Sequence, residues 1–163
     1  MEDLFMHNTK IDIPKPKREK IVTILNQSLA DATDLKSQAK QAHWNVKGMN
    51  FIALHELFDQ VATELDTHVD DIAERITTLG GTAMGTVRLA AKNSTLPEYP
   101  HEITDGTAHV DALSAALADF GKKARKNIDE TDELGDADTA DLFTGVSRGV
   151  DKLLWFVEAH IQS

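Results

Sequence analysis

The sequence contains no cysteine among its 163 residues. Disulfide bonds and thiolate metal sites are therefore excluded, and a bound metal must be held by histidine, carboxylate or water ligands. The lack of cysteine also agrees with a reducing cytoplasm, in which disulfides do not persist.

Long apolar runs are also missing, because no stretch approaches the roughly 18 apolar residues of a membrane span. The first ten residues, MEDLFMHNTK, lack the basic-then-apolar pattern of a secretory signal. We therefore expect a soluble cytoplasmic protein, in the nucleoid or free of it, with no membrane partner. A net charge of -10 disfavours nonspecific nucleic-acid binding by the whole surface, whereas it attracts divalent cations.

Alternation of apolar and polar residues with a period of two is absent, so no β-sheet is predicted. Apolar residues instead recur at steps of three and four, as in amphipathic helices, over residues 21–42, 54–79, 110–128 and 143–161. Glycine and proline separate these four stretches. The pattern predicts an all-α protein with one four-helix bundle domain over residues 18–163, after an extended or disordered polar tail at residues 1–17.

The connection between the second and third helices, residues 80–102, is longer than a simple bundle needs. Within it, residues 84–92 are predicted to form one or two helical turns. Long crossovers occur in ferritin-like bundles, whereas up-and-down bundles have short loops. The predicted architecture is therefore a ferritin-like four-helix bundle with a short extra helix in the crossover.

The second predicted helix carries two pairs of possible metal ligands at a spacing of four residues, His55 with Asp59 and Asp70 with Glu74. At 100° per residue, all four lie within about 100° of one another, on a stripe that points away from the apolar stripe of the same helix. This ligand stripe must therefore face solvent or another subunit.

Asp59 and Asp70 are about 16 Å apart along the helix axis, too far to bind the same metal ion within one chain. If two copies of this helix pack about a two-fold axis, each pair meets the other pair of the partner. His43, near the end of the first helix, is expected at the height of His55. Two histidines and three carboxylates suit ferrous iron, and a two-electron reaction with peroxide would require two irons.

Several motifs resemble the signature of the Dps family of miniferritins. They are QAHWN at residues 41–45, FIALHELFD at 51–59, DDIAER at 70–75 with LGG at 79–81, and TAD, SR and DKLLWF at 139–141, 147–148 and 151–156. The resemblance implies a dodecameric shell built from two-fold dimers and a ferroxidase that prefers hydrogen peroxide and stores a ferric mineral. It further implies iron sites that join His43, His55 and Asp59 of one subunit to Asp70 and Glu74 of the partner subunit, without an organic cofactor.

The same resemblance suggests roles for residues outside this ligand set. Trp44 would lie close to the iron and quench stray oxidising equivalents, although it would serve equally well as an interface anchor. Acidic residues at the start of the fourth helix would line a three-fold pore for iron entry, and the candidates are Asp136, Asp138 and Asp141. A solvated acidic helix start is the alternative interpretation.

A second activity, DNA binding, would reside in the tail. Its basic residues are partly offset by acidic ones, so twelve tails would bind DNA weakly at physiological salt. The candidate DNA contacts are Lys10, Lys15, Lys17, Arg18 and Lys20. The alternative function is therefore a DNA-condensing nucleoid protein in which the metal sites are secondary.

Simpler interpretations exist for each ligand taken alone. His43 could be a core histidine, His55 with Asp59 a surface pair, and Asp70 with Glu74 a solvated helix face. An ordinary ferritin with a di-iron site inside the bundle is disfavoured, because Glu-x-x-His spacing occurs only at Glu98 and His101, in a loop that contains proline.

Overall fold

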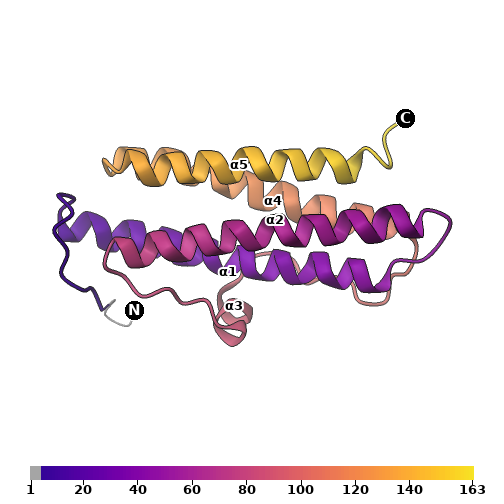
Figure 1. Ribbon diagram of the computed structural model, residues 1–163, viewed down its shortest axis with the longest axis horizontal. Coiled ribbons are helices and arrows are strands. Elements are labelled where there is room, and N and C mark those ends of the chain that lie inside the picture. The colour runs from indigo at the N-terminus through magenta and orange to yellow at the C-terminus, as the bar shows by residue number, and fades with distance from the viewer. Residues whose placement is uncertain (1–4) are drawn as a thin grey trace.

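The computed structural model describes residues 5–163 and contains five helices within them. They are α1 (Lys15–Asn45), α2 (Phe51–Thr78), α3 (Val87–Asn93), α4 (Gly106–Glu133) and α5 (Ala137–Glu158). The hairpins α1–α2 and α4–α5 form the two halves of a four-helix bundle (Figure 1). The short α3 packs on the outside of α1, and no helix in residues 5–163 has the length and apolarity to cross a membrane.

The four predicted apolar stripes form the core between the hairpins. Its largest side chains with almost no exposed surface include Phe58, Phe120 and Phe143. One prediction at the end of the last stripe is wrong, because α5 ends at Glu158 and Ile161 lies beyond it, 42% exposed. Three residues that we assigned to the tail, 15–17, instead form the first turn of α1, where Pro16 is tolerated because the first turn needs no intrahelical donor.

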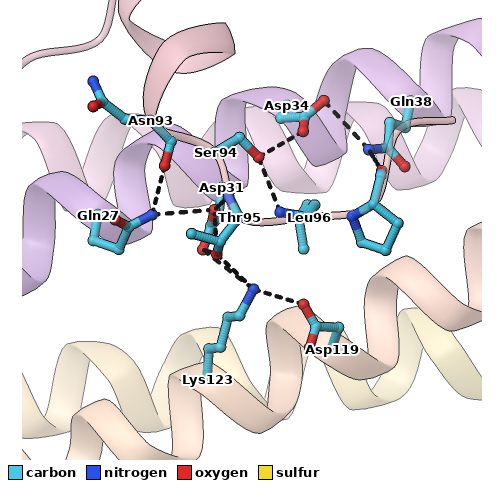
Figure 2. A network of polar contacts seen from close by, with 11 residues as sticks. Gln27, Asp31, Asp34, Gln38, Asn93, Ser94, Thr95, Leu96, Asp119 and Lys123 are labelled. Atoms are coloured by element: carbon cyan, nitrogen blue, oxygen red, sulfur yellow. Dashed lines mark hydrogen bonds and ion pairs between the residues drawn. The ribbon is translucent and has the colours of Figure 1, made fainter.

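A buried carboxylate fixes the long crossover to the bundle. Asp31 on α1 is 1% exposed and accepts hydrogen bonds from the backbone N–H of Thr95, at 2.7 Å, and from its hydroxyl. Lys123 on α4 lies 3.7 Å from Asp31 and donates to the Thr95 hydroxyl at 2.7 Å. Figure 2 shows α1, the crossover and α4 meeting at this point. The crossover is therefore an ordered part of the fold.

The end of α2 also receives the N-terminal segment. The N–H of His7 donates to the carbonyl of Gly80 at 2.7 Å, and Met6, Ile11 and Ile13 pack against the core. Gly80 has φ +89°, and a Cβ on it would lie 2.6 Å from the carbonyl oxygen of His7. Only glycine fits both constraints. Residues 5–14 contain no helix or strand, and these contacts hold them against the bundle. Residues 1–4 of the predicted tail are outside the described residues.

Candidate metal centre

His43 and His55 face each other where α1 ends and α2 begins. Nδ1 of His43 lies 2.6 Å from the backbone carbonyl oxygen of His55, and Nδ1 of His55 lies 2.8 Å from that of His43. The two imidazoles are stacked, with centroids 3.8 Å apart and planes 19° from parallel. A carbonyl only accepts hydrogen bonds, so both Nδ1 atoms carry the proton and both Nε2 atoms keep a free lone pair.

The end of α1 makes this arrangement available. The last carbonyls of a helix have no intrahelical partner, and the N–H of Lys47, the natural partner of the His43 carbonyl, donates to Thr104 at 2.8 Å instead. His55 therefore takes a carbonyl that the helix leaves free. The short connection between the two helices brings the rings to the same height, as the sequence predicted for His43 and His55.

Asp59, one turn after His55, is held by a lysine of α1. Lys40 Nζ lies 2.6 Å from the carboxylate of Asp59, whose side chain is 50% exposed. The hydrogen bond from Lys40 holds the pKa of Asp59 below its ordinary value; desolvation opposes this effect, and the charges of Lys40 and of the two histidines when protonated add to the lowering. The carboxylate is thus ionised and presented at the surface. Sequence reasoning did not identify Lys40 as part of this arrangement.

Asp70 and Glu74 lie on the second half of α2, remote from this cluster, and both are exposed. Within residues 5–163 no three histidine or carboxylate side chains of the single chain come together as a metal site. The structure thus brings His43 and His55 into contact, places Asp59 one helical turn further along α2 in a pair with Lys40, and leaves Asp70 and Glu74 apart from all three. One chain presents two separate groups of donors.

Exposed apolar side chains occur where α1 ends and α2 begins, next to the histidine pair in the chain. This apolar patch consists of Trp44, Met49, Phe51 and Ile52, with exposed fractions from 41% to 104%. Phe51 packs on His55 at 5.0 Å between centroids, and Lys40 lies 5.7 Å from the ring centre of Trp44. Apart from Trp44, sequence reasoning missed these residues, although their position off the core-facing stripe was the available signal. Grouped apolar surface of this kind is typical of an interface with another protein chain.

The three pore candidates differ in position. Asp138 and Asp141 are exposed on the first turns of α5, as a pore lining requires. Asp136 is 2% exposed, and its carboxylate accepts from the backbone N–H of Thr139 and from Arg75, at 2.8 Å. It therefore caps α5 and pairs with α2, so it is not available as a cation ligand at the surface.

The candidate DNA contacts also separate into two groups. Arg18 is 6% exposed, and its guanidinium donates to the carbonyls of Leu79, at 2.6 Å, and Ile13, at 3.0 Å. It anchors the N-terminal segment to the end of α2 and is not free for phosphate. The exposed basic residues are Lys10, Lys15, Lys17 and Lys20.

Comparisons with known proteins agree with this fold. The ferritin-like domain family matches residues 22–163, so the chain is a ferritin-like protein. It is 48% identical over 156 residues to a DNA protection during starvation protein of Agrobacterium fabrum, with 96% of each chain covered. Among solved structures it resembles Mycobacterium smegmatis Dps, with TM-score 0.91, 32% identity and 96% of both chains covered. It also resembles Microbacterium arborescens Dps in the high iron form, with TM-score 0.84, 30% identity and coverage of 91% of this chain and 96% of that one.

The chain belongs to the Dps family of the ferritin-like superfamily. This confirms the family and the fold that the motifs predicted. The all-α bundle, the long crossover and the short helix within it are all present.

Proposed function

We propose that the protein oxidises ferrous iron with hydrogen peroxide at sites shared by two subunits, and stores the ferric product inside a shell of twelve chains. The observation that carries this proposal is the reciprocal pair of hydrogen bonds between His43 and His55. These bonds orient two imidazoles so that both Nε2 lone pairs are available beside the ionised carboxylate of Asp59. Imidazole and carboxylate together form a donor set that suits ferrous iron.

The separation of the two donor groups on α2 favours a site completed by a second subunit. The His43, His55 and Asp59 group lies next to the apolar patch of Trp44, Met49, Phe51 and Ile52, which a protein partner would bury. A two-fold axis through the middle of α2 would bring Asp70 and Glu74 of the partner subunit to this group and form the site twice. The same contact would then bury the apolar surface and complete the metal ligands.

Iron is a substrate in this proposal. Two ferrous ions each give one electron, and one peroxide with two protons becomes two water molecules. The chain's contribution is to hold the ions with oriented imidazoles and ionised carboxylates. Ferrous iron and hydrogen peroxide, which together would form hydroxyl radicals, are then consumed in the same reaction. The high iron form of the relative from Microbacterium arborescens supports iron as the metal.

The decisive experiment replaces both histidines. His43→Gly/His55→Gly is expected to abolish rapid oxidation of anaerobically added ferrous iron by peroxide while native mass spectrometry still finds the intact assembly. His101→Gly, an exposed histidine on the crossover, is the control and keeps the wild-type rate. Unchanged oxidation in the double variant would refute the proposal. Addition of oxygen in place of peroxide to the wild type determines the preferred oxidant.

DNA condensation is the second candidate function, and the similarity to the DNA protection during starvation protein of Agrobacterium fabrum favours it. Four exposed lysines near the N-terminus, Lys10, Lys15, Lys17 and Lys20, would supply the contacts. The attachment of residues 5–14 to the bundle and the net charge of -10 both weaken such binding. A gel-shift titration across salt concentrations tests it, and no retardation even at low salt would eliminate it.

A further inference from the structure

A buried phenol and imidazole lie outside the proposed iron ligands. Tyr99, in the crossover, places its hydroxyl 2.7 Å from Nδ1 of His109 on α4. Tyr99 is 9% exposed and His109 is 1% exposed. Tyr99 is also the only tyrosine in the chain. The proposed oxidation and storage of iron use neither residue.

The surroundings of the pair determine the direction of its hydrogen bond. Burial lowers the pKa of His109, which the nearby Asp105 and the backbone of Ile103 and Asn45 partly oppose, and burial raises the pKa of Tyr99. Both rings are therefore neutral near neutral pH. The Tyr99 hydroxyl has one hydrogen-bond partner among the described residues, Nδ1 of His109 at 2.7 Å, so the buried O–H is satisfied only if Nδ1 accepts from it. We therefore place the proton of the neutral imidazole on Nε2.

The imidazole of the pair lies close to the α1–α2 hairpin that carries the candidate iron site. The backbone of Asn45, which influences His109, follows His43 by two residues. The ring of Phe58, with its centroid 6.4 Å from that of His109, belongs to the residue before Asp59. Tyr99 and His109 thus pack against the inner side of the same α1–α2 hairpin that carries the histidine pair on its outer side.

We propose that Tyr99 and His109 form a redox pair that captures one-electron oxidants formed from hydrogen peroxide at the iron site, an inference that rests on the proposed function. Tyr99 gives one electron to an oxidant of the hydroxyl-radical class, which is reduced to hydroxide. The hydroxyl proton moves to Nδ1 of His109, leaving a neutral tyrosyl radical and an imidazolium. A further ferrous ion then returns the electron and becomes ferric, and the proton returns to the phenol.

The physical reason for assigning this role to the pair is the fate of the proton. Loss of an electron makes a phenol a strong acid, so oxidation is favourable only if a base takes the proton at once. A buried phenol has little water to receive it. Nδ1 of His109 is the base that lies within hydrogen-bond distance, and its place on a helix keeps the two groups aligned. A purely structural hydrogen bond would need neither a basic partner nor nearness to the iron site.

The test uses the assembled protein with ring-deuterated tyrosine. Rapid freezing after ferrous iron and peroxide are mixed is expected to trap a radical whose electron paramagnetic resonance spectrum changes with the deuteration. Because the chain has a single tyrosine, this change identifies Tyr99 without any substitution. Tyr99→Phe is expected to lose the signal and His109→Asn to lose most of it, since asparagine accepts a hydrogen bond but is not a base. His101→Asn is the control and keeps the signal.

A second arm separates this inference from the proposed function. A flash-generated one-electron oxidant such as tris(bipyridine)ruthenium(III), added without iron, is expected to give the same radical in the wild type and little in His109→Asn. If iron is oxidised normally but no deuterium-sensitive signal forms in either arm, the redox pair is refuted while the ferroxidase remains. If iron is not oxidised at all, the proposed function fails and the flash experiment alone decides on the pair.

Discussion

The two ends of α2 each carry a pair of predicted metal donors, but the pairs are organised differently. At its start, His55 and Asp59 are each held by a group of α1, the His43 carbonyl at 2.8 Å and Lys40 at 2.6 Å. Toward its end, Asp70 and Glu74 are exposed, and only the backbone beside them is fixed, because Arg75 is anchored to the buried Asp136 at 2.8 Å. One half of the proposed site is therefore arranged by its own chain, whereas the other half is presented on a rigid helix.

The largest expected effect comes from mixing variants that damage opposite ends of α2. His43→Gly/His55→Gly and Asp70→Ala/Glu74→Ala should each be inactive alone. In a mixed two-fold dimer, one site has both halves damaged and the other has both intact. Co-assembly at equal amounts should therefore restore about one quarter of the wild-type iron oxidation. Mixtures that stay inactive, with mixed assembly verified by native mass, would contradict a site shared between subunits.

The anchor at the end of α2 can be broken separately. Asp136→Ala removes the cap of α5 and leaves Arg75, whose side chain is 16% exposed, without its partner. Removing one partner of a buried ion pair lowers the free energy of unfolding by about 3–5 kcal/mol, so a large fall in the thermal unfolding temperature is expected. Asp138→Ala, at an exposed acid in the first turn of the same helix, is the control and should change stability by less than about 1 kcal/mol, the size of its interaction with the helix dipole. Equal effects of the two variants would contradict the buried role of Asp136.

Removal of Lys40, whose side chain pairs with Asp59 at the start of α2, should have a smaller effect than the variants above, and it should strengthen iron binding. Its ammonium group lies on the Asp59 oxygen that we propose for iron, and Asp59 is ionised at neutral pH with or without it. Lys40→Ala is therefore expected to tighten ferrous iron binding by at most about five-fold, because an exposed ion pair contributes little. Calorimetric titration under anaerobic conditions measures this. Lys36→Ala, which breaks an equally short pair with Asp66 at 2.6 Å, is the matched control and should leave the affinity unchanged.

The smallest expected effect concerns His109, which packs behind the start of α2. An unfolded chain protonates this histidine near pH 6.5, whereas the folded chain does so only at lower pH. As the pH falls below 6.5 the unfolded state therefore binds more protons, and stability decreases; above 6.5 there is no contribution. In urea unfolding experiments, His109→Asn should therefore show a smaller decrease in the free energy of unfolding below pH 6.5 than the wild type. His101→Asn, at an exposed position, should leave the slope as in the wild type.

The sequence predicts what depends on periodicity and spacing. The helices and their core faces follow from steps of three and four residues, and the nearness of His43 to His55 follows from a short hairpin. It does not predict pairings that depend on tertiary structure. Arg18 and Asp136 look like surface charges in the sequence, but each meets groups about sixty residues away, at Leu79 and Arg75.

Sequence periodicity also failed where a helix terminates. Ile161 continues the apolar spacing of α5, but the helix ends at Glu158 and nothing in the spacing marks that end. The periodicity also does not predict the apolar patch next to the histidine pair, because its members fall outside the core-facing stripes. Both cases show that a pattern along one helix carries no information on what lies across from it.

The mutual hydrogen bonds of His43 and His55 have an evolutionary consequence. Each imidazole takes its orientation from the backbone carbonyl of the other residue and stacks on the other ring at 3.8 Å. A substitution at one position leaves its backbone carbonyl in place, so the remaining imidazole keeps its hydrogen bond and loses only the stacked ring. Each position can therefore change without disorienting the other, and we expect lineages that lose iron oxidation to lose one of the two histidines before the other.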